Sequence, residues 1–220
     1  MATESGQLRV NYLDQPIRMF LDDLAARTPT PGGGSASALA GALGAALGNM
    51  AAAFTTGNKK FEAVWRQAEE MNARLGKLRG RFEELLQEDI AAYGVCCDIA
   101  RAVPARTAAE REELRRLRGA ARETATLVPE EIVDVACRGL QLVEELAAIA
   151  NPNLASDLAV AAYFLEAAAR GAGIQVLCNC AADDNKERSA GRRAAIAERI
   201  QQCQASRERI HCTVMRLLKL

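Results

Sequence analysis

The side chains of this 220-residue chain that could do chemistry are carboxylates and lysines rather than histidines. Its single histidine, His211, excludes His-based triads and most zinc hydrolase sites, so acid–base chemistry must come from Asp, Glu, Lys, Tyr or Cys. Asp89 is the most unusual of these groups, because it interrupts an apolar pattern of three- and four-residue steps from Phe61 to Cys96. An isolated buried charge is costly, so we predict that Asp89 is paired, protonated or facing a polar cavity.

The stretch from Thr28 to Phe54 joins two prolines, the three glycines 32–34, Ser35 and a long Ala/Gly-rich run. One interpretation is close packing, because glycines on a helix let neighbouring helices approach almost backbone to backbone. The other is an anion site, because a glycine loop that opens a helix presents N–H groups and the positive end of the helix dipole. The sequence leaves both interpretations open. Neither the P-loop pattern nor the G-x-G-x-x-G dinucleotide fingerprint occurs in this stretch.

Two further polar segments lie at predicted helix ends. Lys59 and Lys60 follow the Ala/Gly-rich run, and Asn151 and Asn153 flank a proline that breaks the chain. We expect Asn153 to be the N-cap of a helix whose first turn contains Asp157. Capping and dipole complementarity are the structural explanation, and a polar cluster held at a helix mouth is the functional one.

These groups must be positioned by helices, because the chain is rich in Ala, Leu, Glu and Arg and poor in aromatic and β-branched residues. We predict an all-α fold, a bundle of long antiparallel helices around the central Ala/Gly-rich helix, as a single domain over residues 1–220. Small residues near Ala168 should pack against that central helix. Pro129 is expected to kink or restart the chain. Apolar spacing predicts helices at about residues 8–26, 35–56, 61–103, 132–147, 153–182 and 189–218.

Charge and cysteine patterns exclude several classes of function. Lys+Arg and Asp+Glu balance at 28 each, and the charged segment 106–122 has mixed signs without aromatics, which favours a solvated helix face over nucleic-acid binding. The nearly uncharged run 36–54 is long enough for a membrane, but its Ala/Gly content favours a buried helix. Seven cysteines without a CxxC pair are expected to be separate buried thiols of a cytoplasmic protein, with no metal site.

Three segments of the chain resemble one known family. They read PGGGSASALAGALGAALGNM, TGNKKF and ANPNLASDLAVAAYFLEAAARGAGIQV. The chain resembles the cyclodeaminase/cyclohydrolase family, which includes the C-terminal domain of formiminotransferase-cyclodeaminase and stand-alone bacterial methenyltetrahydrofolate cyclohydrolases. The resemblance implies an all-helical homodimer with a tetrahydrofolate site lined by both long motifs. It also implies a folate derivative as the substrate and no metal or redox cofactor.

The resemblance suggests roles for individual residues. Asp89 and Asp157 are candidates for proton transfer or for stabilising the cationic amidine, and Lys60 is a candidate for proton transfer. The substrate-binding candidates are the helix-mouth loop, one lysine and two asparagines: Gly33, Gly34, Ser35, Lys59, Asn151 and Asn153. We expect Asn151 to Asp157 and Asp89 to form the wall opposite the glycine loop.

The leading hypothesis is formiminotetrahydrofolate cyclodeaminase, which converts 5-formiminotetrahydrofolate to 5,10-methenyltetrahydrofolate and ammonia. The alternatives are 5,10-methenyltetrahydrofolate cyclohydrolase and a catalytically silent folate-binding or structural helical dimer. The silent alternative is motivated by departures from the family pattern at Asn58, Ala105 and Leu177, where basic residues are usual.

Overall fold

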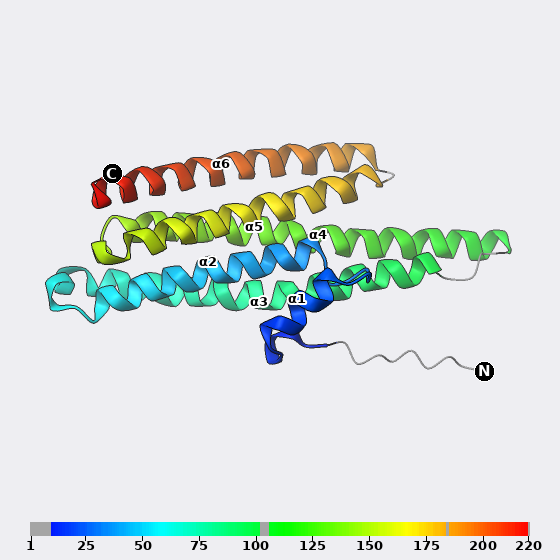
Figure 1. Cartoon of the computed structure of the whole chain (residues 1–220). Helices are drawn as coiled ribbons and strands as arrows, with labels where there is room; N and C mark the ends of the chain where they lie inside the picture. Colours follow the sequence, from blue (N-terminus) through cyan, green and yellow to red (C-terminus); the bar gives the residue numbers. More distant parts are fainter. Residues whose placement is uncertain (1–9, 102–105, 184, 220) are drawn as a thin grey trace.

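The computed structural model describes residues 10–101, 106–183 and 185–219, and its long helices run antiparallel in one bundle (Figure 1). Over these residues the structure contains helices and no strand, which confirms the all-α prediction. The α-helices are α1 (Ile17–Ala25), α2 (Gly33–Thr56), α3 (Trp65–Arg101), α4 (Ala108–Ala147), α5 (Ala155–Ala181) and α6 (Lys186–Leu218). Three short 3-10 turns, η1 (Tyr12–Asp14), η2 (Lys59–Val64) and η3 (Pro152–Leu154), lie between them.

The Ala/Gly-rich helix α2 is central, because it packs against α3, α5 and α4 (Figure 1). Its glycines permit close contacts. A Cβ atom at Gly41 would lie 2.3 Å from the Phe82 ring on α3, and one at Gly44 would lie 2.9 Å from the Ala161 carbonyl oxygen on α5. Such distances leave no room for a methyl group, so the close-packing interpretation of this stretch is confirmed. By length and composition alone α2 could cross a membrane, but here it lies among the other helices.

Ion pairs join the outer helices. Arg81 on α3 binds Glu131 on α4 with a shortest N–O distance of 2.7 Å. Arg207 on α6 binds the buried Glu166 on α5 at 2.9 Å. These pairs lie across the contacts of α3 with α4 and of α5 with α6.

Helix α4 runs without interruption through Pro129, so the alternative that the helix restarts there is wrong. Proline lacks the N–H group that would bind the carbonyl oxygen four residues earlier, which belongs to Ala125. The side-chain amide of Asn179, on α5, donates a hydrogen bond of 2.9 Å to that oxygen. A neighbouring helix therefore supplies the donor that proline removes, and the helix continues.

Other boundaries also differ from the prediction. The first helix spans only Ile17–Ala25, because residues 12–14 form a separate 3-10 turn. Asn153 is not the N-cap of α5, as predicted, because Leu154 holds that position. Asn151 caps the preceding η3, and its side chain accepts a 3.1 Å bond from the Asn153 N–H. The predicted end of the third helix near residue 103 lies outside the described residues.

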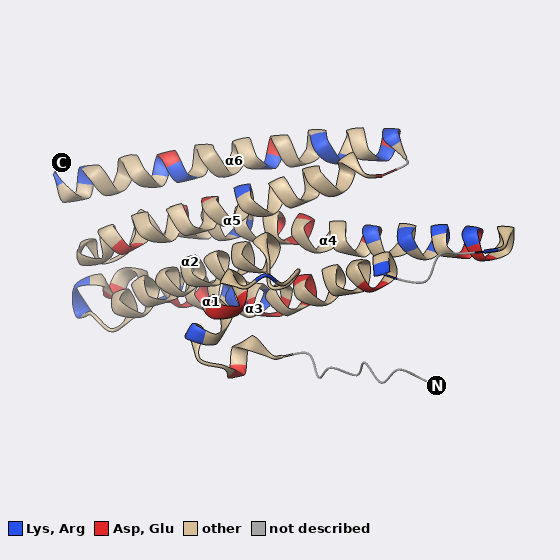
Figure 2. Cartoon of the chain, turned by 45° about the vertical axis from the view of Figure 1, so that its right-hand side comes forward, with Lys and Arg blue, Asp and Glu red and all other residues tan. Residues whose placement is uncertain are grey.

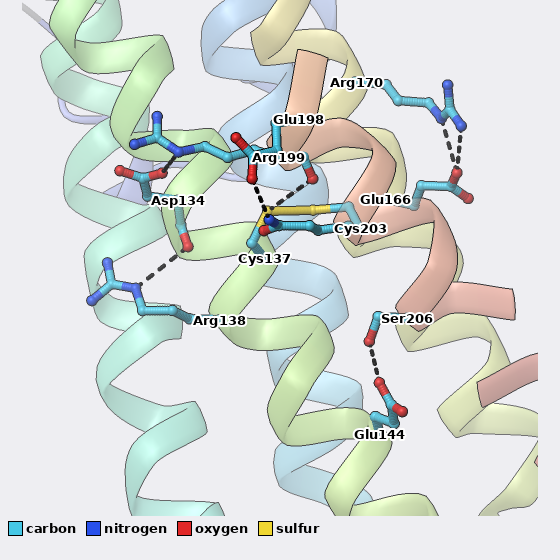
Figure 3. The surroundings of a disulfide bond; sticks show 11 residues. Asp134, Cys137, Arg138, Glu144, Glu166, Arg170, Glu198, Arg199, Cys203 and Ser206 are labelled. Atoms are coloured by element: carbon cyan, nitrogen blue, oxygen red, sulfur yellow. Dashed lines mark hydrogen bonds and ion pairs between the residues drawn. A yellow bond between two sulfur atoms is a disulfide. The ribbon is translucent and has the colours of Figure 1, made fainter. Parts of the chain in front are cut away.

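Two of the seven cysteines form a disulfide, which corrects the prediction that all are separate thiols. Figure 3 shows the bond between Cys137 on α4 and Cys203 on α6, whose Cα atoms are 5.4 Å apart. This Cα separation is usual for disulfides. Five cysteines among the described residues remain thiols, namely Cys96, Cys97, Cys178, Cys180 and Cys212.

Candidate active site

Asp89 lies over the N-terminus of α2. A Cβ atom added to Gly34 would come within 2.1 Å of Asp89 Oδ1, so only glycine allows the carboxylate to approach the helix this closely. Ser35 caps the start of α2 with its side chain, because the Gly32 N–H donates a 2.9 Å bond to Ser35 Oγ. The structure thus brings together Asp89 and the glycine loop, the two strongest chemical signals in the sequence. The anion at this helix mouth is the carboxylate of Asp89, and not a bound anionic ligand, which the sequence analysis considered.

The surroundings of Asp89 tune its proton affinity. Burial raises the pKa of Asp89 from 3.8 to about 6, while the facing backbone amide and hydroxyl of Ser35 oppose that rise. A carboxylate with this pKa is largely ionised at pH 7 and can still take up a proton. Its position on an apolar seam is therefore explained by a polar cavity, one of the three outcomes that we predicted for Asp89.

The cavity beside Asp89, which we call the glycine pocket, has a volume of about 200 Å³. Its polar lining includes three residues that the sequence analysis gave no role: Tyr93, Gln175 and Asn179. Tyr93 follows Asp89 by one helical turn, and Gln175 and Asn179 are likewise one turn apart on α5. For Gln175 and Asn179, the signal that could have identified them is the four-residue spacing of two amides within the Ala-rich helix α5.

The remaining predicted site residues lie at the opposite end of α2. Lys59 and Lys60 belong to η2, which follows the last turn of α2, and both are exposed. The 23 steps between Gly33 and Thr56 at 1.5 Å each separate the two ends by roughly 35 Å. Within one chain these lysines therefore do not reach Asp89.

Asn151, Asn153 and Asp157 also lie at this distant end, so the predicted wall opposite the glycine loop is wrong within a single chain. The backbone N–H of the buried Asn151 donates a 3.0 Å bond to Thr55 Oγ1 near the end of α2. Asp157 is half-buried in the first turn of α5, and Asn153 is exposed. We call Lys59, Lys60, Asn151, Asn153 and Asp157 together the distal group.

Two positions that depart from the family pattern are accounted for locally. The Asn58 side chain accepts a 3.0 Å bond from the Lys60 N–H and so caps η2. Leu177 is exposed on α5. Ala105 lies outside the described residues.

Within the described ranges, no three His, Cys, Asp or Glu side chains lie close enough together to hold a metal ion.

The fold and the glycine pocket define a class of all-helical proteins in which a carboxylate of raised pKa faces the glycine-rich mouth of a central helix. A family model described as Formiminotransferase-cyclodeaminase matches residues 16–198. The chain belongs to this family.

Individual relatives agree with that assignment. A methenyltetrahydrofolate cyclohydrolase of Methylorubrum extorquens is 31% identical over 91% of this chain and 96% of its own length. A formimidoyltransferase-cyclodeaminase of Rattus norvegicus is 30% identical over 77% of this chain, but over only 31% of its own length. The crystal structure of formiminotetrahydrofolate cyclodeaminase from Thermotoga maritima superposes with a TM-score of 0.76, at 26% identity, over 94% of this chain and 97% of that one.

Proposed function

We propose that this protein is an enzyme of tetrahydrofolate one-carbon interconversion and that its activity is formiminotetrahydrofolate cyclodeaminase. The observation that carries the proposal is Asp89, a carboxylate with a pKa of about 6 in a pocket at the mouth of the glycine helix. The family membership and the Thermotoga maritima structure support the choice of substrate.

The proposed reaction requires proton transfers that Asp89 can perform. N10 of 5-formiminotetrahydrofolate attacks the formimino carbon and loses its proton to the ionised Asp89. The proton then passes to the formimino nitrogen, the carbon–nitrogen bond breaks, and ammonia leaves behind the 5,10-methenyl cation. The ionised carboxylate also stabilises the positive charge on the amidine and on the product. No oxidation state changes, so the reaction needs no redox cofactor.

The second candidate is 5,10-methenyltetrahydrofolate cyclohydrolase, which the Methylorubrum extorquens relative favours because this chain matches 96% of its length. In that reaction Asp89 would take a proton from the water molecule that adds to the methenyl carbon. The same residue and the same pocket therefore serve either substrate.

We further propose that the protein is a homodimer that pairs through α2 and α5. These two helices pack side by side. Their outer faces expose large apolar side chains, namely Leu43, Phe54, Val160, Phe164 and Ile174. Burial of such a face against a second copy stabilises a dimer.

A two-fold axis through the middle of α2 would exchange its ends. Lys60 of the partner subunit would then lie beside Asp89, and the partner's Asp157 would approach the same cleft. This arrangement reconciles the distal group with the glycine pocket. In it, Asp89 and the partner's Asp157 and Lys60 handle protons and charge, while Lys59 of the partner subunit contributes to substrate binding.

The test of the activity is to offer the purified protein 5-formiminotetrahydrofolate and 5,10-methenyltetrahydrofolate and to follow the methenyl chromophore. Appearance of the chromophore from the first substrate supports the cyclodeaminase. Loss of the chromophore above the spontaneous rate, with the second substrate alone, supports the cyclohydrolase. Turnover of neither substrate contradicts both.

A further inference from the structure

Gln175 is a residue of the glycine pocket that has no role in the proposed proton transfers. Its side chain reaches from α5 to the mouth of α2, where a Cβ atom added to Gly33 would lie 2.7 Å from Gln175 Nε2. A Cβ atom added to the next residue, Gly34, would instead meet the carboxylate of Asp89 on α3. Two successive glycines therefore each admit one polar side chain, and the two side chains come from different helices.

A close contact between α2 and α5 brings Gln175 to this position. One helical turn before Gln175, a Cβ atom added to Gly171 would clash with Ser37 Oγ on α2. The Ser37 hydroxyl also donates a 2.6 Å bond to the carbonyl oxygen of Gly33, so α5 lies directly against the first turn of α2. Residues four apart share one face of a helix, and Gln175 therefore lies over the mouth of α2.

Two side-chain amides line the glycine pocket, and the fold uses only one of them. The Asn179 amide donates its 2.9 Å bond to the carbonyl oxygen of Ala125. The Gln175 amide has no hydrogen-bond partner among the described residues, although Gln175 is half-buried and lines the same cavity. Its donor and acceptor atoms are therefore available to a ligand beside Asp89.

The charges around Gln175 restrict the kind of ligand. Helix α2 contains no Lys, Arg, Asp or Glu residue, and residues 171–181 of α5 contain none either, so both segments are tan in Figure 2. Among the described residues that line the glycine pocket, Asp89 is the one charged side chain. A carboxylate beside an amide, without a cation, disfavours an anionic group and suits a small molecule with N–H or O–H donors.

We propose that Gln175 binds the ammonia that leaves in the cyclodeaminase reaction, or the water molecule that enters in the cyclohydrolase reaction. This proposal rests on the proposed function, which supplies the folate. In the first reaction N10 bonds to the carbon of the protonated formimino group, and the N10 proton passes through Asp89 to the formimino nitrogen. That nitrogen leaves as NH3 with the electron pair of the broken carbon–nitrogen bond. The amide oxygen of Gln175 accepts a hydrogen bond from this nitrogen and holds it beside Asp89.

The test measures the reverse reaction, in which ammonia adds to 5,10-methenyltetrahydrofolate, the bond from the carbon to N10 breaks, and the chromophore disappears. Rates above the enzyme-free rate, at one pH and varied ammonium chloride, give the KM for ammonia, and varied folate gives the KM for the folate. Gln175→Met keeps the length of the side chain but removes the amide, and it breaks no hydrogen bond among the described residues.

Loss of one net hydrogen bond corresponds to a factor of roughly 2 to 12 in affinity, so the KM for ammonia should rise by that factor in Gln175→Met. The KM for the folate should not change. If the wild type consumes the methenyl folate without ammonia, Gln175→Met should instead lower kcat for hydrolysis by a similar factor at unchanged KM.

Gln141→Met is the matched control, because it makes the same change at an exposed glutamine of α4 and should leave every constant unchanged. Gln175→Glu keeps the length of the side chain and an acceptor oxygen, so it should retain the affinity for ammonia that Gln175→Met loses. An equal rise in both variants would show a packing effect and overturn the proposal.

Two further results separate this proposal from the proposed function. Unchanged constants in Gln175→Met, or a rise in the KM for the folate in place of the KM for ammonia, overturn the role of Gln175 and leave the proposed function standing. Wild-type protein that turns over neither folate in either direction contradicts the proposed function, and the role of Gln175 falls with it.

Discussion

Replacement of Asp89 by asparagine should separate catalysis from stability. Burial raises the pKa of the folded carboxylate from 3.8 to about 6. A raised pKa means that the folded protein favours the neutral form of Asp89. The contribution of Asp89 to the free energy of unfolding is therefore greatest at low pH and is lost as the pH rises through about 6. The shift of about 2 pKa units corresponds to roughly 3 kcal/mol of destabilisation by the ionised side chain at pH 7.

Asparagine has nearly the same shape as aspartate but carries no charge. Asp89→Asn should therefore raise the free energy of unfolding at pH 7, by about 1–3 kcal/mol, and change it little at pH 4. Activity should fall by about 100- to 10,000-fold, which is the range for loss of a general base. In the wild type, kcat/KM should rise with pH through an inflection near 6, and the variant should lack that inflection.

The assays are urea unfolding at pH 4 and pH 7 and turnover of 5-formiminotetrahydrofolate followed by the methenyl chromophore. Glu88→Gln is the matched control, because Glu88 precedes Asp89 on α3 but binds Arg81 on the bundle surface. It should leave turnover unchanged. An Asp89→Asn variant that retains turnover within threefold, or that loses stability at pH 7, would refute the reasoning.

Three further substitutions test the packing around the site. Gly34→Ala places a methyl group 2.1 Å from Asp89 Oδ1, so it should displace the carboxylate and lower turnover as much as Asp89→Asn does. The double variant with Gly34→Ala and Asp89→Asn should lose no more turnover than Asp89→Asn alone. Asn179→Leu leaves the Ala125 carbonyl without its donor and should lower the free energy of unfolding by about 1–3 kcal/mol, measured by urea unfolding. Cys137→Ser opens a loop closed across 66 residues and should cost about 4 kcal/mol under oxidising conditions.

Each of these substitutions has its own control. Gly80→Ala meets no atom within 4 Å of the new Cβ and should leave turnover unchanged, so equal losses at both glycines would contradict the steric argument. Pro129→Ala restores the backbone donor and should rescue Asn179→Leu, and a failure to rescue would contradict the compensation at Pro129. Cys212→Ser removes a free thiol and should not alter the free energy of unfolding. A count of seven reactive thiols in the oxidised, unfolded wild type would disprove the disulfide.

The helices could be predicted from the sequence because their signals are local. The apolar spacing along α3, the low aromatic content and the glycine loop before α2 each depend on residues within a few turns of one another. The same local pattern singled out Asp89, since a carboxylate on an apolar seam is visible without a fold. The family segments identified the class of folate enzymes, because they are long and specific.

Other features depend on contacts between residues far apart in the chain. The continuity of α4 through Pro129 requires Asn179, 50 residues later, and the Cys137–Cys203 bond requires α6 to lie on α4. No local pattern encodes such pairs.

The tertiary structure also decided which candidate residues meet. It placed Asp89 at Gly34, because α3 runs antiparallel to α2, and it placed Asn151 and the start of α5 beside the last turn of α2. The sequence by itself therefore determined the helices and the kind of chemistry. Only the packing of the helices decided which carboxylate faces the glycine loop.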